Sequence, residues 1–509
     1  MTRNSGPRER AEEYLKTAHL YKLGTLPTEA CHPRTRNLSE LARSDLKEAA
    51  RLLLSVDVDA LRAVRGALPE VSELTAAVQD TFKAGGRVFL CGCGATGRLS
   101  LSLEYLWRRA AREGSRDSVV GFMAGGDVAL VHSLEGFEDF PEYGAEQLRG
   151  LGFGKNDLLV SSTEGGETPF VIGATEEACR VSKRPPFFLF CNPKDVLLRE
   201  VERSRRVLQN PGIRSICLYV GPMALSGSTR MQASTVLMLG IGLALFPGKD
   251  ARLEEFIAHT LSLDISRLEP FIRLEADAYH ANDRVLYTAD EYAITVFTDS
   301  TERSPTFSLP PFNNQVLPRN EHSLSYIMLP GCRTPIEAWR KLLLREPRVL
   351  GWPARNPKTT LEYLLGFDFG DNARAYRERV LPGAHHLEFS ITREGKDVLW
   401  SFRKHSERFR NSGHGELFDH LLLKMMLNIH STLLMGRMNR YMGNLMTWVN
   451  PTNGKLVDRA ARYARLLLEG SGVTGVTHEE VVRELFVQME SLSDNESVVL
   501  KTLAALKAR

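Results

Sequence analysis

Three loops rich in glycine and hydroxyl side chains contain the residue types that point most directly to chemistry. Each loop follows an apolar run and precedes a helical one. Their candidate phosphate-binding residues are Gly94, Ala95, Thr96 and Gly97; Ser162, Thr163, Gly165, Gly166 and Thr168; and Ser226, Ser228 and Thr229. A glycine turn before a helix presents free N–H groups and the positive end of the helix dipole to an anion. Because the loops lack a cluster of Lys and Arg, they indicate one small phosphate rather than a nucleic acid.

Two glutamates, Glu164 and Glu167, lie within the second loop. A carboxylate beside a bound phosphate is unfavourable unless it faces the sugar or a cation. Glu164 is therefore a candidate base that moves a proton between adjacent carbons, as an aldose–ketose isomerase requires. For Glu167 we expect an exposed side chain at a helix N-terminus, stabilised by the helix dipole.

The elements that position these loops alternate between strands and helices. Apolar runs predict strands at residues 88–91, 119–123, 157–161, 187–192 and 214–220. Pro169 fits the first turn of the helix after the second loop. The alternation predicts a parallel, doubly wound sheet, and in such sheets the loops at the carboxyl ends of the strands converge on the ligand.

A second unit follows the boundary at residues 247–250. Its predicted strands are residues 293–297, 325–328, 388–391 and 398–402. Its glycine-rich loops are poorer than those of the first unit, so a phosphate pocket there is expected to be degenerate. Residues 421–438 predict a long apolar helix in the core or at an interface between domains.

Several motifs together resemble the sugar-isomerase (SIS) domain group that contains N-acetylmuramic acid 6-phosphate etherase and the glucokinase regulatory protein. Besides the three loops, the matching motifs are Thr28-Glu29 with His32-Pro33, Glu135-Gly136-Phe137-Glu138-Asp139, Gly443-Asn444-Leu445-Met446, Pro451-Thr452-Asn453-Gly454-Lys455-Leu456 and Asp458-Arg459-Ala460. The resemblance covers roughly residues 20–245 and 415–509, while the middle of the chain matches poorly.

The resemblance implies an α/β fold with two tandem, doubly wound SIS-type (flavodoxin-like) domains, a helical N-terminal preface and a helical C-terminal cap. We expect a helical N-terminal segment at residues 1–74 and a first SIS domain with the phosphosugar-binding loops at residues 75–246. A divergent second SIS domain is expected at residues 247–450 and a helical cap at residues 451–509. Such a fused pair is expected to be a monomer with an internal pseudo-dimer, or a homodimer.

The etherases eliminate lactate after removing the proton beside the carbonyl, which requires two carboxylates in different protonation states. Glu138 matches one family glutamate, but Leu106 stands where the other is expected. Glu104 is two residues away and points to another side of the helix. Residues 299–307 resemble the missing motif, so we hypothesise that Glu302 supplies the second carboxylate from the second unit. Lys455, in the tail signature, is a candidate ligand for a substrate phosphate or hydroxyl.

Three functions remain open at this stage. The first, which we favour, is an etherase-like lyase acting on a sugar 6-phosphate through Glu138 and Glu302. The second is a non-catalytic sugar-phosphate sensor that regulates a sugar kinase, as the glucokinase regulatory protein does. The third is a sugar-phosphate isomerase that uses Glu164. The tandem layout favours the sensor, and the two glutamates favour the lyase.

The composition of the chain limits its possible partners, compartment and cofactors. The chain has 509 residues, 43% of them hydrophobic, and a net charge of +3, which indicates no nucleic-acid or membrane partner. Seven cysteines without framework spacing indicate a reducing compartment, so a cytoplasmic protein is expected. The histidines form no cluster, and no metal or other cofactor is expected.

Overall fold

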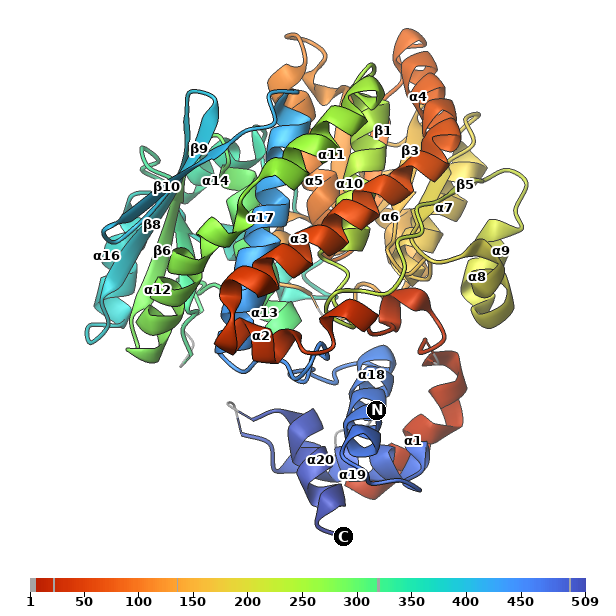
Figure 1. Cartoon of the computed structure of the whole chain (residues 1–509). Coiled ribbons are helices and arrows are strands. Elements are labelled where there is room, and N and C mark those ends of the chain that lie inside the picture. The colour runs from red at the N-terminus through yellow and green to blue at the C-terminus, as the bar shows by residue number, and fades with distance from the viewer. Residues whose placement is uncertain (1–5, 22, 135, 318–320, 494–495) are drawn as a thin grey trace.

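Two five-stranded sheets organise the part of the chain that the computed structural model describes (Figure 1). The described residues are 6–21, 23–134, 136–317, 321–493 and 496–509. Glu135, one residue of the motifs named above, lies outside them.

The first sheet is parallel throughout and has the strand order β2-β1-β3-β4-β5. Its strands are β1 (Val88–Gly92), β2 (Val119–Met123), β3 (Leu158–Ser162), β4 (Phe187–Phe190) and β5 (Arg214–Cys217). This is the flavodoxin-like order, in which the ligand binds at the switch point between β1 and β3. The expectation of a doubly wound first sheet is confirmed, although β5 ends three residues earlier than predicted.

Helices cover both faces of the first sheet. They are α4 (Leu68–Lys83), α5 (Ala95–Ala110), α6 (Pro141–Gly150), α7 (Pro169–Val181), α8 (Lys194–Glu200), α9 (Glu202–Leu208) and α10 (Gln232–Leu245). Pro169 lies at the start of α7, as expected from its fixed φ and missing N–H. Strands β1 to β4 are buried along their whole length, as an apolar strand between two helical layers must be.

The second sheet is mixed, with the order β10-β9-β8-β6-β7. Its strands are β6 (Arg284–Ala289), β7 (Ser325–Met328), β8 (His386–Glu394), β9 (Asp397–Phe402) and β10 (His405–Arg410). β6, β7 and β8 are parallel, whereas β8, β9 and β10 form an antiparallel meander. The second unit therefore keeps the α/β character but departs from the doubly wound pattern at this edge. Its other elements are α11 (Leu253–Ser262), α12 (Glu269–His280), α13 (Ala293–Phe307), α14 (Pro335–Leu343), α15 (Leu361–Leu365), α16 (Asn372–Val380) and α17 (Glu416–Arg437).

One strand prediction in this unit is wrong. Residues 293–297 form the first turns of α13, and the strand before them is β6, which the sequence analysis missed together with β10. The segment Ala-Ile-Thr-Val-Phe is apolar and β-branched, and all five residues are buried. A short, fully buried run has no polar face, so its periodicity does not distinguish a helix from a strand. The long helix predicted at 421–438 is confirmed as α17.

The two ends of the chain form one helical cap. α1 (Pro7–Thr17) packs against α19 (His478–Glu490), which contacts α18 (Gly454–Gly470) and α20 (Val498–Lys507). Figure 1 shows this group of helices below both sheets. The four domain ranges expected from the sequence remain a prediction. Within the first of them, residues 1–74, α1 packs against the cap.

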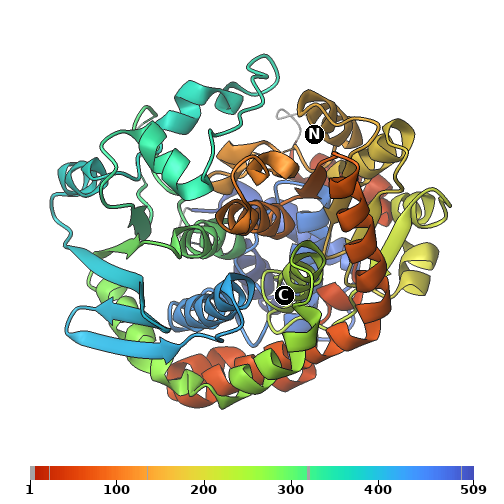
Figure 2. The same ribbon diagram turned by 90° about the horizontal axis from the view of Figure 1, so that it is seen from above.

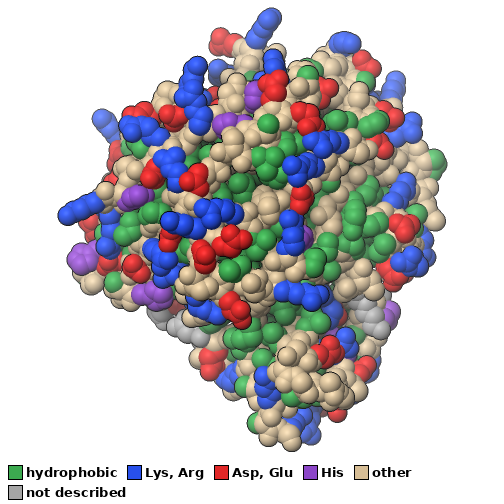
Figure 3. Space-filling view, in the orientation of Figure 1, with side chains coloured by type: hydrophobic (Ala, Val, Ile, Leu, Met, Phe, Trp, Pro, Cys, Tyr) green, Lys and Arg blue, Asp and Glu red, His purple; other side chains and the backbone are tan. Residues whose placement is uncertain are grey.

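Two further N-terminal helices connect the sheets. α2 (Leu38–Ser44) packs on α17, and α3 (Leu46–Ala63) contacts both α10 and α17. In the view from above, α3 runs along the rim shared by the two units (Figure 2). The face seen in Figure 3 has Lys and Arg interspersed with Asp and Glu. Within the described residues, no helix is both long and apolar enough to cross a membrane.

Candidate functional site

The loop between β1 and α5 is shaped by its own backbone and by Thr96. A side chain at Gly92 would lie 2.3 Å from the backbone of Thr96, and Gly94 adopts a positive φ of 55°. The Thr96 hydroxyl accepts a hydrogen bond from Cys93 N and donates one to Cys93 O, both at 2.9 Å. Thr96, predicted as a ligand residue, is fully buried and closes the turn. The turn leads directly into α5, whose N-terminus faces the carboxyl edge of the sheet.

The loop between β3 and α7 is tight as well. Thr163 N donates to Leu189 O at 3.0 Å, and the hydroxyls of Thr163 and Thr168 lie 2.9 Å apart. Asn192 donates to Gly165 O at 2.9 Å and thereby ties the end of β4 to this loop. Ser162 is completely buried at the end of β3. Gly166 has a φ of 76°, and a side chain there would meet Leu197 at 2.5 Å.

The third loop, between β5 and α10, was expected to offer Ser226 to a ligand, but it does not. Ser226 is fully buried; its hydroxyl donates to Glu29 O at 2.8 Å and lies 3.0 Å from the Tyr463 hydroxyl. Ser226 therefore joins the N-terminal segment to the cap. Ser228 is also buried, whereas the side chain of Thr229 acts on Glu164 and lowers the pKa of that carboxyl group.

Glu138 and Cys93 lie side by side at the mouth of the first loop. Cys93 Sγ is 3.8 Å from Glu138 Oε2, and Asn453 Nδ2 donates to Glu138 Oε1 at 3.1 Å. Burial raises the pKa of the Cys93 thiol well above its usual range, and the charges of Glu138 and Glu164 raise it further. The cysteine is therefore a protonated neighbour of both carboxylates.

Glu164 is the carboxyl group with the most unusual environment in the site. It is 8% exposed, and its Oε1 atom is buried without a hydrogen-bond partner among the described residues. Burial raises the pKa of Glu164 to about 7, and the charge of Glu302 adds to this rise. Lys455 and the Thr229 hydroxyl oppose it. Near neutral pH, Glu164 thus exists in both protonation states.

Glu302 reaches the first unit from α13. It lines a small cavity together with Ala95 and Arg98 of α5 and Lys424 of α17. Burial lowers the pKa of Lys424 to about 8, and the charge of Glu302 opposes this fall. The second unit therefore places one carboxylate at the beginning of α5, although on a helix and not at the end of a strand as expected.

Leu106 and Glu104 of α5 do not face the glycine loop. Leu106 is 2% exposed and packs in the core. Glu104 lies in a buried ion cluster, with Oε2 at 3.0 Å from Arg345 Nε and Oε1 at 2.9 Å from Arg348. Glu104 therefore points away from the glycine loop, as its spacing predicted.

The expectation for Glu167 is wrong. Its side chain is 3% exposed and forms ion pairs with Lys455, at 2.5 Å, and with Arg203. Burial opposes its charge, but the two cations outweigh this and hold the pKa of Glu167 at about 2. Neighbouring residues do not indicate these partners, because Arg203 lies 36 positions and Lys455 288 positions away along the chain.

Lys455 and Asn453 bring the cap to the site. Asn453 caps α18 by accepting a hydrogen bond from Leu456 N at 3.0 Å, and Lys455 follows in the first turn. Burial disfavours the Lys455 charge, yet Glu167 and Glu138 raise its pKa well above the usual range. Asn453 belongs to the site through its hydrogen bond to Glu138, although the sequence motif did not single it out as a site residue.

Glu29 anchors this arrangement from the other end of the chain. Arg459 donates to both Glu29 oxygens, at 2.6 and 3.1 Å, and Arg462 donates to one at 3.0 Å. The neighbouring Thr28 exchanges hydrogen bonds with the side chain of Asn192, at 2.9 and 3.1 Å. The N-terminal segment thus connects α18 to the loop between β3 and α7.

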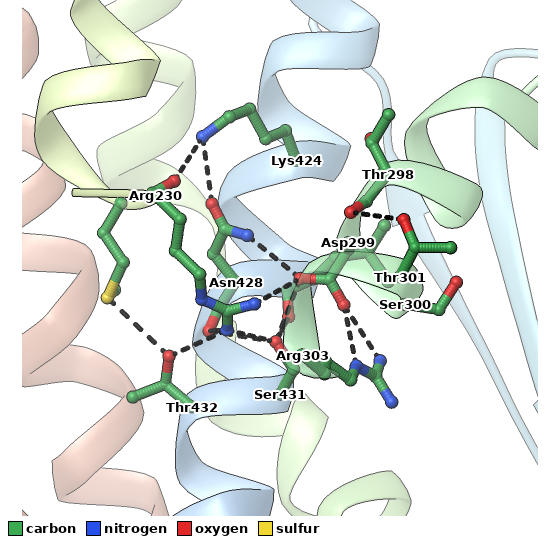
Figure 4. Close-up of polar contacts among 12 residues, drawn as sticks. Arg230, Thr298, Asp299, Ser300, Thr301, Arg303, Lys424, Asn428, Ser431 and Thr432 are labelled. Atoms are coloured by element: carbon green, nitrogen blue, oxygen red, sulfur yellow. Dashed lines mark hydrogen bonds and ion pairs between the residues drawn. The ribbon is translucent and has the colours of Figure 1, made fainter. Parts of the chain in front are cut away.

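A buried polar network holds α13, the helix that carries Glu302, against α17 (Figure 4). Asp299 accepts hydrogen bonds from Asn428 at 3.0 Å and Ser431 at 2.9 Å, and it pairs with Arg230 and Arg303 at 3.3 and 2.9 Å. Arg230 therefore pairs with a structural carboxylate and does not face a phosphate loop. The network fixes the helix that presents Glu302.

Comparison with known proteins supports the first unit's assignment. Residues 70–179 match the family model of the glucokinase regulatory protein N-terminal SIS domain. The chain contains a SIS domain. It is 33% identical over 218 residues to N-acetylmuramic acid 6-phosphate etherase of Salinibacter ruber, and 34% identical over 218 residues to that of Streptomyces avermitilis.

These alignments cover 43% of this chain and 65% of each etherase, so somewhat less than two thirds of the relatives is represented. Among solved structures, a tagatose-6-phosphate ketose/aldose isomerase from Escherichia coli superposes with a TM-score of 0.42 at 11% identity, covering 81% of this chain and 98% of that one. Among the described residues, no group of three or more His, Cys, Asp and Glu side chains is arranged to hold a metal ion.

Proposed function

We propose that this chain binds a sugar phosphate at the carboxyl edge of its first sheet. The phosphate would lie against the loops before α5 and α7, where free backbone N–H groups and two helix N-termini favour an anion. Lys455, whose ammonium group lies beside Glu167 and Glu138, would neutralise part of the charge of the phosphate. The similarity to etherases whose names specify a sugar 6-phosphate supports this ligand class.

We further propose acid–base chemistry on the bound sugar, of the etherase type. The observation that supports it is that Glu138, Glu164 and Glu302 surround the same glycine loop from three different elements. Carboxyl groups held in different protonation states are the usual arrangement for proton removal and return. Because the pKa of Glu164 is about 7, this group can hold or release a proton near neutral pH.

In this proposal, Glu302 removes the proton from the carbon beside the carbonyl and Glu138 assists the departure of the substituent on the next carbon. The electron pair of the broken C–H bond forms a carbon–carbon double bond, the C–O bond breaks, and the leaving oxygen receives a proton. Glu164 supplies or stores that proton. The phosphate and Lys455 hold the sugar in register with these groups.

The test is a proton NMR time course in deuterated water with N-acetylmuramic acid 6-phosphate. We expect deuterium to enter the carbon beside the carbonyl and lactate to appear, and we expect Glu302→Gln and Glu138→Gln to slow both by about a hundredfold or more. Glu362→Gln, an exposed change on α15, is the matched control and should leave both rates unchanged. Exchange in Glu302→Gln at the original rate would refute the assigned role of Glu302.

A second candidate is a sensor that binds the sugar phosphate without converting it and regulates a sugar kinase. The match of residues 70–179 to the regulatory protein's SIS domain, and the presence of two sheets and a cap, favour this alternative. In the same NMR experiment, a sensor would broaden the ligand signals with neither deuterium exchange nor lactate release.

A further inference from the structure

A second cavity, of about 430 Å³, lies between the first sheet and the second unit. It is bounded by the edge strand β2, helix α6 and residues 348–352 of the second unit, and none of the candidate phosphosugar residues lines it. In the view from above, the chain after α14 lies beside this edge of the first sheet (Figure 2). The volume falls in the range of small-molecule binding sites.

One wall of the cavity is aromatic and rigid. Phe122 of β2 and Trp352 line it. The Trp352 ring stacks on Phe137, with centroids 6.2 Å apart and planes 13° apart, and the Arg355 guanidinium lies 4.7 Å from the Trp352 ring centroid. Because these contacts hold the indole in place, the cavity presents a preformed surface for a planar ring.

At its inner end the cavity is lined by the guanidinium group of a buried ion cluster. Arg348 lines it and is 27% exposed. Its partner, the buried Glu104, also pairs with Arg108 at 3.4 Å and with Arg345 at 3.0 Å. The only other buried carboxylate of this cluster among the described residues is Asp127, which pairs with Arg345 at 2.6 Å. Arg108 also pairs with the exposed Asp117, so the three guanidinium groups at this end are matched by three carboxylates, two of them buried.

The outer end of the cavity has an excess of positive charge. Arg149 lines the cavity and is 51% exposed, and it pairs with Glu177 at 3.0 Å. Glu177 also pairs with Arg180 at 2.7 Å, so two guanidinium groups share one carboxylate. Glu146, a further lining residue, does not offset this excess, because it pairs with Arg355 at 2.7 Å.

We propose that this cavity binds a small organic anion of about mononucleotide size, with a planar ring against Phe122 and Trp352 and an acidic group beside Arg149. A carboxylate or a phosphate supplies the acidic group equally well, because guanidinium groups bind both through paired hydrogen bonds. The site is separate from the sugar-phosphate site, and its test does not depend on catalysis.

The experiment follows the indole N–H signal of Trp352 in the full-length protein, assigned with Trp352→Phe. The probes are adenosine 5′-monophosphate against adenosine, and indole-3-acetate against indole. We expect at least one acid to bind about tenfold more tightly than its neutral counterpart. The acid that binds identifies the group as a phosphate or a carboxylate. No response to either acid, or equal binding of the neutral compounds, overturns the proposal.

Matched variants place the ligand. Arg149→Gln should weaken binding about fivefold or more, whereas Arg180→Gln removes the same charge from the same ion-pair partner outside the cavity and should have little effect. Gly150→Trp should abolish binding by filling the cavity, and a Cβ atom added at Gly150 meets no atom within 4 Å. Equal weakening by Arg149→Gln and Arg180→Gln, or undiminished binding to Gly150→Trp, would contradict this location.

Discussion

The substitution Glu29→Gln tests how the two ends of the chain hold the site together. Glu29 is 6% exposed, and it receives Arg459 and Arg462 from α18. Burial alone would raise its pKa, but the two guanidinium groups hold the pKa of Glu29 at about 2, against an ordinary value of 4.5. This difference corresponds to about 3 kcal/mol of stabilisation at neutral pH.

The glutamine cannot neutralise the two arginines: Arg459 would remain buried without its carboxylate, whereas Arg462 keeps its ion pair with Asp458 at 2.7 Å. Removing one member of a buried ion pair costs about 3–5 kcal/mol, in agreement with the value from the pKa. The contacts involved join the N-terminal segment to α18, so the loss should appear as easier opening of the cap. Lys455 and Asn453, in the first turn of α18, should then bind a sugar phosphate less tightly.

Native-state hydrogen exchange of the α18 amides measures this opening. We expect protection in Glu29→Gln to fall by about two to three orders of magnitude. The matched control is Glu490→Gln, which removes the exposed ion pair between Arg10 and Glu490 in the same cap and should change protection by less than about 1 kcal/mol. In the wild type, the depressed pKa means that this stability is present above pH 4.5 and is lost as the pH falls toward 2. Unchanged α18 protection in Glu29→Gln at neutral pH would refute the reasoning.

Three further predictions concern the site itself. Because the pKa of Glu164 is raised in the folded state, its contribution to stability is complete below pH 4.5 and declines as the pH rises through about 7. Thermal melts across this pH range should show this decline in melting temperature in the wild type and not in Glu164→Gln. Lys455→Met should weaken binding of N-acetylglucosamine 6-phosphate about tenfold or more in calorimetry, and Lys455→Arg should restore part of it; equal affinity in both variants would argue against a phosphate contact. Thr96→Val should lower the free energy of unfolding by about 1–3 kcal/mol in urea melts, since Cys93 N loses its acceptor while Cys93 O keeps only the Thr96 backbone N–H, and no change would show that the loop does not need this hydroxyl.

The local features of the first unit were predictable from the sequence, because each depends on neighbouring residues. Residues 88–91 form a buried strand, Gly94 has the positive φ that a turn requires, and Pro169 begins α7. The order of these elements sufficed to predict a doubly wound sheet.

The second unit was harder to predict, for a physical reason. The run at 293–297 is buried on every side, so no polar face marked it as a helix. Long-range ion pairs were equally hidden. Glu167 looked exposed until the fold brought Arg203 and Lys455 to it, and Ser226 looked like a ligand residue until Tyr463 and the backbone of Glu29 occupied its hydroxyl.

The most direct test of the central claim is a crystal structure of the full-length chain with N-acetylglucosamine 6-phosphate bound. Our account predicts the phosphate against the loops before α5 and α7, within hydrogen-bond distance of Lys455, and the sugar between Glu138 and Glu302. A sugar phosphate bound elsewhere, or no bound ligand at concentrations that saturate the protein in calorimetry, would contradict it.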